Sequence, residues 1–254
     1  MVEFILGNMK NIYLITDCVD IAAVEMKAVI RSQVKSSNIT IDIAPVAPLS
    51  IINGSFILRL MAEVASPGSI LSVVLNPLKE RTERLAGRLK EKNLYFTSAN
   101  TGVLGWLLDD FGCDEVIEIT DPGFKPFGGK YVHSPAIARI ANGEKLTGIG
   151  NPFDIKRIRK INIDEGTIVH IDNFGLMKVK AEAPRAKDGD YFLVNIKNKK
   201  IKMIYWTRMM SRDNGEWVIY PGSSFGLLEI GRVRENGALD IGAEIGDKIT
   251  FKKI

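Results

Sequence analysis

Residues 12–30 read IYLITDCVDIAAVEMKAVI, and this stretch predicts a strand, a short polar corner and a helix. Ile12–Ile15 is β-branched and aromatic, and it is too short for a helix. Asp20 is a suitable N-cap for the helix that follows. Beyond it, the apolar residues repeat at helical spacing: Ala22, Met26, Val29 and Ile30.

Asp17 directly follows this strand and is the first candidate site residue. Open α/β sheets bind ligands at the carboxyl ends of their strands, where the N-terminal N–H groups of the next helix also lie. The alternative is an ordinary structural role for Asp17, either as an Asx-turn residue or as a second cap.

Length and composition indicate a globular protein of one large or two modest domains, because 254 residues with 46% hydrophobic content can bury a substantial core. No apolar run approaches the roughly 18 residues of a membrane span, and the start MVEFILGNMK has no signal-peptide pattern. We therefore expect a cytoplasmic protein without a membrane partner. Cys18 and Cys113 form no C-x-x-C pair, so both are expected to be buried thiols.

The net charge of +4 is mild. Its basic clusters, Lys156–Lys160 and Lys197–Lys202, are short and are not interleaved with aromatic residues as a base-stacking surface would be. We interpret them as solvated surface, and nucleic acid is not an expected partner.

From Asn11 to about Asp121 the chain alternates strand-like and helix-like runs, which predicts βαβ units and a mainly parallel sheet. An N-terminal α/β domain is therefore expected over residues 1–155. The glycine- and proline-rich segment Asp121–Lys130 predicts a loop, and Ser134–Ala141 predicts a short helix. The alternating runs are Ile39–Ile43, Ile51–Val64, Ile70–Leu75, Arg81–Glu91, Leu94–Thr97, Val103–Phe111 and Glu115–Thr120.

Past Gly150 the pattern becomes strand-rich, with short apolar or alternating runs separated by Gly, Asn and Asp turns. This spacing is typical of a small barrel or sandwich, so a C-terminal β-barrel domain is expected over residues 156–254, with a ligand cleft between the two domains. The predicted strands are Ile158–Ile163, Thr167–Asp172, Lys178–Ala181, Tyr191–Ile196, Ile201–Trp206, Glu216–Tyr220, Gly226–Val233 and Lys248–Lys252.

Common catalytic motifs are absent from the sequence: there is no G-x-G-x-x-G after the first strand, no P-loop, no G-x-S-x-G and no H-E-x-x-H. His133 and His170 are the only histidines, and neither has metal-ligand spacing nearby. We expect structural histidines, no metal site and no cofactor.

Several stretches, taken in order, resemble the S-adenosylmethionine hydroxide adenosyltransferases (SAM hydrolases), relatives of the fluorinase and chlorinase enzymes. Thr16-Asp17, followed by Asp20 and Met26-Lys27, is similar to the family's T-D-F-G and D-x-Y-V-G-x-M-K. Further matches extend over nearly the whole chain: SPGSILSVVLNP (66–77), FTSANTGVL (96–104), FGGKYVHSPAIARIANG (127–143), HIDNFG (170–175), PGSSFGLLEI (221–230) and Asn236-Gly237-Ala238.

The resemblance implies an N-terminal α/β domain, a C-terminal β-barrel and a homotrimer with a nucleoside bound between neighbouring copies. S-adenosylmethionine would be the substrate or ligand, rather than a cofactor. Asp17 would hold the ribose hydroxyls and Asp172 would face the amino end of the methionine part. Five more residues would complete the substrate-binding set: Phe127 and Phe174 as apolar walls, and Ser224 with Asn236 and Ala238 at the adenine edge. For both phenylalanines, core packing is the alternative.

This chain departs from the family at its water-orienting residues. The family's Asp, Arg and His set becomes Asn76, Arg84 (or Arg81) and Gly128. Asn76 can hydrogen-bond a water but carries no negative charge, and Gly128 contributes no side chain. His133 is a candidate replacement for the missing imidazole. Further departures from the family's ligand contacts fall at Asn100, Thr101 and Leu176.

Two functions therefore remain open. The first is a divergent hydrolase that converts S-adenosylmethionine and water to adenosine and methionine by displacement at the ribose 5′ carbon, with Asn76 and Arg84 as catalytic residues. The second is a nucleoside- or SAM-binding protein that has lost turnover on the same scaffold. A structural or interaction module is a third alternative, since fold alone does not decide function.

Overall fold

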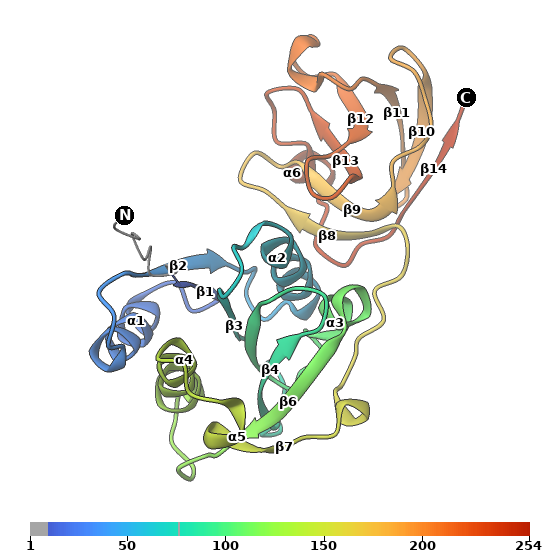
Figure 1. The fold of residues 1–254 in the computed structure, drawn as a ribbon. Coiled ribbons are helices and arrows are strands. Elements are labelled where there is room, and N and C mark those ends of the chain that lie inside the picture. Colours follow the sequence, from blue (N-terminus) through green and yellow to red (C-terminus); the bar gives the residue numbers. More distant parts are fainter. Residues whose placement is uncertain (1–9, 76) are drawn as a thin grey trace, which may run out of the picture. The chain divides into compact units, whose positions relative to one another are not determined.

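The computed structural model describes residues 10–75 and 77–254. The chain divides into Met1–Ile161, here called unit 1, and Asn162–Ile254, called unit 2. Each unit is built around its own large sheet (Figure 1). Within the described residues, no helix is both long and apolar enough to cross a membrane.

The unit 1 sheet is mixed, rather than mainly parallel as expected. Its strand order is β2-β1-β3-β5-β4-β6-β7. The first four strands in this order are parallel, whereas β4, β6 and β7 join by antiparallel pairing. The strands are β1 (Lys10–Thr16), β2 (Ile39–Pro45), β3 (Ile70–Val74), β4 (Arg84–Leu89), β5 (Tyr95–Ala99), β6 (Cys113–Ile119) and β7 (Gly150–Pro152).

The difference arises at residues 81–91, where the alternation implied a helix and the chain instead forms β4. Gly87 on β4 lies opposite Phe96 on β5. A Cβ atom at Gly87 would lie 2.4 Å from the Phe96 ring, so a side chain there would force the two strands apart. The same Cβ position would lie 2.6 Å from the Glu115 carbonyl of β6, so Gly87 is packed between two strands. The helical interpretation of residues 81–91 was wrong because strand pairing overrides the local preference.

Helices cover both faces of the unit 1 sheet. The pair α1 (Ile21–Gln33) and α4 (Ser134–Ala141) pack together on one face, and α2 (Ile51–Val64) packs with α3 (Gly105–Phe111) on the other (Figure 1). Helix α4 has the predicted bounds. The shorter elements are a π-helical turn, η1 (Gly129–His133), a 3₁₀ turn, η2 (Ile155–Arg157), and α5 (Leu146–Ile149).

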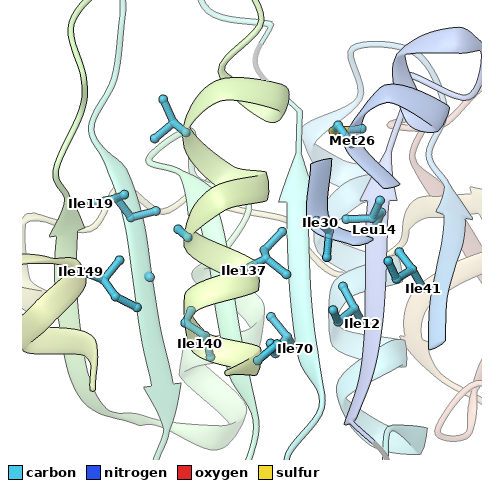
Figure 2. Close-up of a cluster of buried hydrophobic side chains, with 14 of the residues drawn as sticks. Ile12, Leu14, Met26, Ile30, Ile41, Ile70, Ile119, Ile137, Ile140 and Ile149 are labelled. Carbon is cyan, nitrogen blue, oxygen red and sulfur yellow. The ribbon is translucent and has the colours of Figure 1, made fainter. Parts of the chain in front are cut away.

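The core under α1 and α4 shows why the opening stretch decides the fold. Ile12 and Leu14 of β1 point toward Met26 and Ile30 of α1, and all four side chains are fully buried (Figure 2). Full burial of one aliphatic side chain stabilises the folded state by about 1.5–3 kcal/mol. The corner between the two elements is fixed by Asp20, whose carboxylate accepts the Ala22 N–H at 3.0 Å, which confirms the predicted N-cap.

The unit 2 sheet is a curled half-barrel with strand order β14-β10-β11-β12-β13-β9-β8. At one end its two edges meet, where Ile249 N–H donates to Gly166 O and Ile168 N–H donates to Asp247 O, both at 2.8 Å. The elements are β8 (Thr167–Ile171), β9 (Met177–Glu182), β10 (Tyr191–Ile196), β11 (Lys199–Tyr205), η3 (Met209–Ser211), β12 (Trp217–Pro221), β13 (Leu227–Arg232), α6 (Gly237–Ile241) and β14 (Ile249–Lys253).

The strand expected at Ile158–Ile163 does not form, and the buried side chain of Asn100 holds the chain at Arg157 and Arg159 instead. The Asn100 carbonyl accepts the Arg159 N–H at 2.8 Å, and its amide donates to the Arg157 carbonyl at 3.2 Å and to the Glu83 carboxylate at 3.0 Å. Asn100 is therefore occupied in anchoring this segment to unit 1.

Candidate functional site

A pocket of about 450 Å³ opens at the carboxyl ends of β1 and β3, as the strand-turn-helix pattern predicts. The two strand ends are tied together because Thr16 pairs with Val74 and its hydroxyl donates to the Val74 carbonyl at 2.8 Å. The pocket wall includes three of the predicted site residues, together with three further residues used below: Asp17, Arg84, Phe127, Leu49, Gly128 and His133.

The Asp17 carboxylate is held in place by its surroundings. Its Oδ2 accepts the Leu49 N–H at 2.9 Å, and its Oδ1 accepts from the Cys18 thiol at 3.7 Å. Burial, reinforced by the negative charge of Asp17, raises the pKa of Cys18, so the thiol stays protonated and can donate. Each Asp17 oxygen keeps lone pairs for a further donor.

Two residues on the pocket wall have unfavourable backbone conformations. Leu49 and Phe127 have φ values of 57° and 69°, in the left-handed region that non-glycine residues rarely adopt. Each such residue costs about 1–3 kcal/mol, and this kind of strain clusters at functional sites. Their position on the wall of one pocket therefore supports this pocket as the functional site.

Arg84 begins β4 and is half-buried in the pocket wall. Its Nη1 donates to the Thr82 carbonyl. Burial and the nearby charge of Arg81 lower the pKa of Arg84, although an arginine remains charged at neutral pH. Arg81 is itself paired with Asp121, whereas Arg84 has no carboxylate partner within the described residues. Arg84 is thus the arginine whose charge is available to a ligand.

Gly128 lies directly against this guanidinium. A Cβ atom at Gly128 would lie 3.3 Å from both Nε and Nη2 of Arg84. The backbone there is helical, with φ −55° and ψ −28°, so it does not itself require glycine. The absence of a side chain at position 128 therefore lets the backbone lie close to the edge of Arg84 that bears Nε and Nη2.

His133 also contributes to the wall but is only 2% exposed. Burial, with a further contribution from the charge of Arg84, lowers the pKa of His133 to about 3. The imidazole is therefore neutral at neutral pH, and its Nδ1 has no hydrogen-bond partner in the described part of the chain. His133 lies next to Arg84, as a replacement for the missing imidazole would, but no carboxylate among the described residues hydrogen-bonds to it.

His133 predicts a specific pH dependence of stability. Its pKa is about 3 when folded and about 6.5 when unfolded, so the unfolded chain binds the proton more tightly and stability falls as pH drops below about 6.5. This one group should lower the free energy of unfolding by about 3 kcal/mol at pH 4.5. Urea unfolding of wild type and His133→Gln between pH 7 and 4.5 measures the effect. If the free energies of unfolding of the two proteins fall in parallel as the pH is lowered, His133 does not cause the pH dependence.

Asn76 lies outside the described residues, so its catalytic role stays a prediction.

Unit 2 has its own pocket of about 610 Å³, and two predicted site residues, Phe174 and Asn236, line it. Phe174 is 68% exposed, so it is available to a ligand or partner rather than packed in a core. Two methionines, Met209 and Met210, give the wall a flexible apolar surface. Asn236 also caps α6, since its side-chain oxygen accepts the Leu239 N–H at 2.9 Å.

The other predicted unit 2 residues have structural contacts. Asp172 Oδ1 accepts the N–H groups of Phe174 and Leu176, both at 2.9 Å, and so forms the turn that presents Phe174. Ser224 and Ala238 are buried. Neither belongs to the described wall of this pocket, and the Ala238 N–H donates to the Gly175 carbonyl at 3.2 Å.

Sequence reasoning missed a buried charged network beside this turn. Glu229 on β13 is only 4% exposed and lies opposite Lys178 on β9 and Tyr220 on β12. Lys178 Nζ forms an ion pair with Glu229 Oε1, and the Tyr220 hydroxyl donates to Oε2 at 2.8 Å. The available signal was a glutamate within the apolar run LLEI, between the core residues Leu228 and Ile230 and on the opposite face of the strand. This network crosslinks three neighbouring strands.

Comparisons with known proteins agree with this geometry. The sequence model of the SAM hydroxide adenosyltransferase N-terminal domain matches residues 12–150. The fold is similar to that of an uncharacterized conserved protein from Thermotoga maritima, with 22% identity over 95% of this chain and 100% of that chain and a TM-score of 0.85. A conserved hypothetical protein from Thermus thermophilus is also similar, with 17% identity, 96% and 100% coverage and a TM-score of 0.77. No curated protein matches.

Unit 1 is thus a mixed α/β domain with a ligand pocket at the ends of its parallel strands. Because the family's N-terminal domain matches more than half of the chain, this protein belongs to the SAM hydroxide adenosyltransferase family. The resemblance seen in the sequence is confirmed.

Proposed function

We propose that this protein hydrolyses S-adenosylmethionine to adenosine and methionine at the unit 1 pocket. The observation that carries the proposal is that Asp17, Arg84 and Phe127 line one pocket in the family's N-terminal domain. The fixed Asp17 carboxylate suits the two hydroxyls of a ribose, because each of its oxygens can accept a hydrogen bond. Phe127 supplies an apolar wall for the nucleoside.

The reaction needs little acid–base chemistry. Water attacks the ribose 5′ carbon, the C5′–S bond breaks, and methionine leaves with the electron pair as a neutral thioether. The proton lost by the attacking water passes to solvent. Since the sulfonium is already a good leaving group, the protein has mainly to align the water and exclude bulk solvent. Arg84 is the residue for this alignment, because its guanidinium faces the pocket without a carboxylate partner among the described residues.

The second half of the nucleoside site comes, in this proposal, from unit 2 of an adjoining copy in a homotrimer. The exposed Phe174 and the pocket it lines with Asn236 support this role, because an apolar wall and an amide suit an adenine ring. Light scattering on the purified protein tests the assembly, and a monomer at assay concentrations would remove this part of the proposal.

A binding protein without turnover is the second candidate, and a specific observation favours it. Gly128 has no side chain, and His133 is held neutral and buried without an orienting partner among the described residues. Apart from Asp17, which the first candidate assigns to the ribose, and the exposed Glu80, the described pocket wall offers no carboxylate to act as a general base for the water.

One experiment separates hydrolysis from binding alone. The protein is incubated with S-adenosylmethionine in ¹⁸O-labelled water, and adenosine and methionine are measured by chromatography and mass spectrometry. Label in the 5′ hydroxyl of adenosine supports attack at the 5′ carbon. No product above a boiled control, together with measurable binding by calorimetry, selects the binding protein instead.

Asp17→Asn tests the placement of the ribose, because asparagine can still accept the Leu49 N–H but carries no charge. We expect adenosine to bind at least about tenfold more weakly, since hydrogen bonds to a charged group contribute about 1.5–3 kcal/mol. Asp42→Ala, at an exposed position on β2, is the matched control. Equal calorimetric affinities for Asp17→Asn and wild type would show that the ribose lies elsewhere.

A further inference from the structure

One region of the unit 2 sheet is rich in lysine and has no acidic residue. Strands β14, β10 and β11 are neighbours in the sheet (Figure 1), with three lysines in β11, two in β14 and no aspartate or glutamate in any of them. Leu193 of β10 pairs with Lys202 of β11 on one side and with Lys252 of β14 on the other. Directly paired residues point to the same face of a sheet, so the two lysines flank Leu193.

The next residues along the strands continue this face. Asn195 of β10 pairs with Lys200 and with Thr250, and its amide donates to the Thr250 hydroxyl at 3.1 Å. Val194 lies between Leu193 and Asn195 and is fully buried in the core of unit 2, so its two neighbours point outward. The outward lysines are here called the lysine face: Lys200, Lys202 and Lys252.

The lysine face is not neutralised, because no carboxylate among the described residues pairs with its three members. All three side chains are exposed. Most other lysines of unit 2 have an oxygen partner, either a carboxylate or a backbone carbonyl: Lys178, Lys180, Lys197, Lys199, Lys248 and Lys253. Unpaired charges of one sign on a single face attract a partner of the opposite charge.

An exposed aromatic ring adjoins the lysine face. Tyr191 begins β10 and is 41% exposed, and the Lys202 ammonium lies 4.0 Å from the centre of its ring. Tyr191 and Leu193 are two residues apart on one strand, so they point to the same face. Cations beside an aromatic ring are the combination that binds single-stranded nucleic acid, since the cations contact phosphates and a base stacks on the ring.

We infer that the lysine face, together with Tyr191, binds single-stranded nucleic acid. Tyr191 favours this partner over an acidic peptide or a lipid headgroup, because a base has a flat face that can stack on the ring. Small barrels of the OB-fold class also bind oligonucleotides on a sheet face. In the sequence, Lys197–Lys202 is an isolated short cluster, and the fold adds Lys252 and Tyr191 to it. The surface lies within unit 2 and is independent of the proposed reaction at the unit 1 pocket.

The test titrates the full chain into a fluorescently labelled oligodeoxythymidylate, which forms no duplex, and measures anisotropy at several salt concentrations. Each phosphate contact on a single strand lowers the slope of log K against log salt concentration by about 0.7. Three lysines therefore predict a slope of about −2 for the wild-type chain. Polyglutamate and phosphatidylserine vesicles are the comparison probes at the same salt concentrations, and both should bind more weakly than the oligonucleotide.

Substitutions test the charges and the ring separately. Lys200→Gln, Lys202→Gln and Lys252→Gln should each weaken binding and make the slope less negative by about 0.7. Tyr191→Ala should lower the affinity about tenfold through the loss of one stacked base, whereas Tyr191→Phe keeps the ring and should bind as wild type does. Lys253→Gln is the matched control, because Lys253 is next to Lys252 on β14, points to the other face and pairs with Asp190.

Several results would overturn the inference. Absence of oligonucleotide binding does so, as does binding that survives the combined replacement of all three lysines or that falls equally in Lys253→Gln. If polyglutamate or the vesicles bind as tightly as the oligonucleotide, or if Tyr191→Ala keeps wild-type affinity, the surface recognises charge alone and the assignment to nucleic acid is wrong. All the substituted side chains are exposed, so circular dichroism spectra should match that of the wild type.

Discussion

Glu229→Ala is expected to destabilise unit 2 by about 3–5 kcal/mol, because it leaves the ammonium of Lys178 buried without its counter-charge. The exposed fractions of the two side chains are only 13% for Lys178 and 5% for Glu229, so water cannot easily replace the lost carboxylate. The Tyr220 hydroxyl also loses its acceptor. Urea unfolding followed by circular dichroism measures the change in the free energy of unfolding.

Three controls make this result specific. Glu182→Ala removes an exposed glutamate from β9 and should change stability by less than about 0.5 kcal/mol. Tyr220→Phe should cost about 1 kcal/mol, as expected for one hydrogen bond. The double variant Lys178→Met/Glu229→Met should recover most of the loss, since an apolar pair can replace a buried ion pair. If Glu229→Ala lowers the free energy of unfolding no more than Glu182→Ala does, the network of Glu229, Lys178 and Tyr220 does not stabilise unit 2.

Arg84→Met is expected to lower kcat for hydrolysis of S-adenosylmethionine by about 10²–10³-fold, the usual effect of removing one preorganised donor from a reacting centre. KM should change little, because Asp17 and the apolar walls hold the nucleoside. Arg84→Lys separates charge from geometry, since lysine keeps the charge but not the two-donor edge. Initial rates of adenosine formation measure both variants.

The two variants distinguish between the possible roles of Arg84. If Arg84→Lys retains wild-type kcat, then charge alone is sufficient and the directed donors are not needed. If Arg84→Met raises KM without changing kcat, Arg84 contributes uniform binding and does not act on the attacking water. Arg88→Met is the control and should keep wild-type rates, because Arg88 lies on the same strand, is exposed and pairs with Asp114.

Local sequence patterns predicted the parts of the fold that local chemistry decides. The strand, corner and helix of residues 12–30 formed as expected, because β-branched residues, an N-cap and helical spacing all favour the same structure. Helix Ser134–Ala141 and strand Tyr191–Ile196 have the predicted bounds.

The errors occur where distant contacts decide the structure. Strand β4 depends on the pairing of Gly87 with Val116 of β6, and the course of the chain at residues 157–159 depends on Asn100, nearly sixty residues earlier. The spacing of apolar residues along the chain cannot reveal either contact. The mixed sheet follows from the first of them.

The candidate site was only partly predictable for the same reason. Asp17 could be proposed from its position after the first strand in a matching stretch, and Arg84 or Arg81 as the counterpart of the family's arginine. The structure places Asp17 and Arg84 on one pocket wall. The Leu49 N–H that holds Asp17 comes from a loop whose sequence carries no donor pattern. The burial of His133 depends on the packing of the surrounding elements, which its position in the sequence does not reveal.

The backbone of Gly128 has a consequence for substitutions at this position. Since residue 128 adopts ordinary helical angles, an alanine there requires only that the flexible end of Arg84 shift by a few tenths of an ångström. The backbone therefore does not reserve this position for glycine, and the nearness of the Arg84 guanidinium is what limits the side chain that residue 128 can carry.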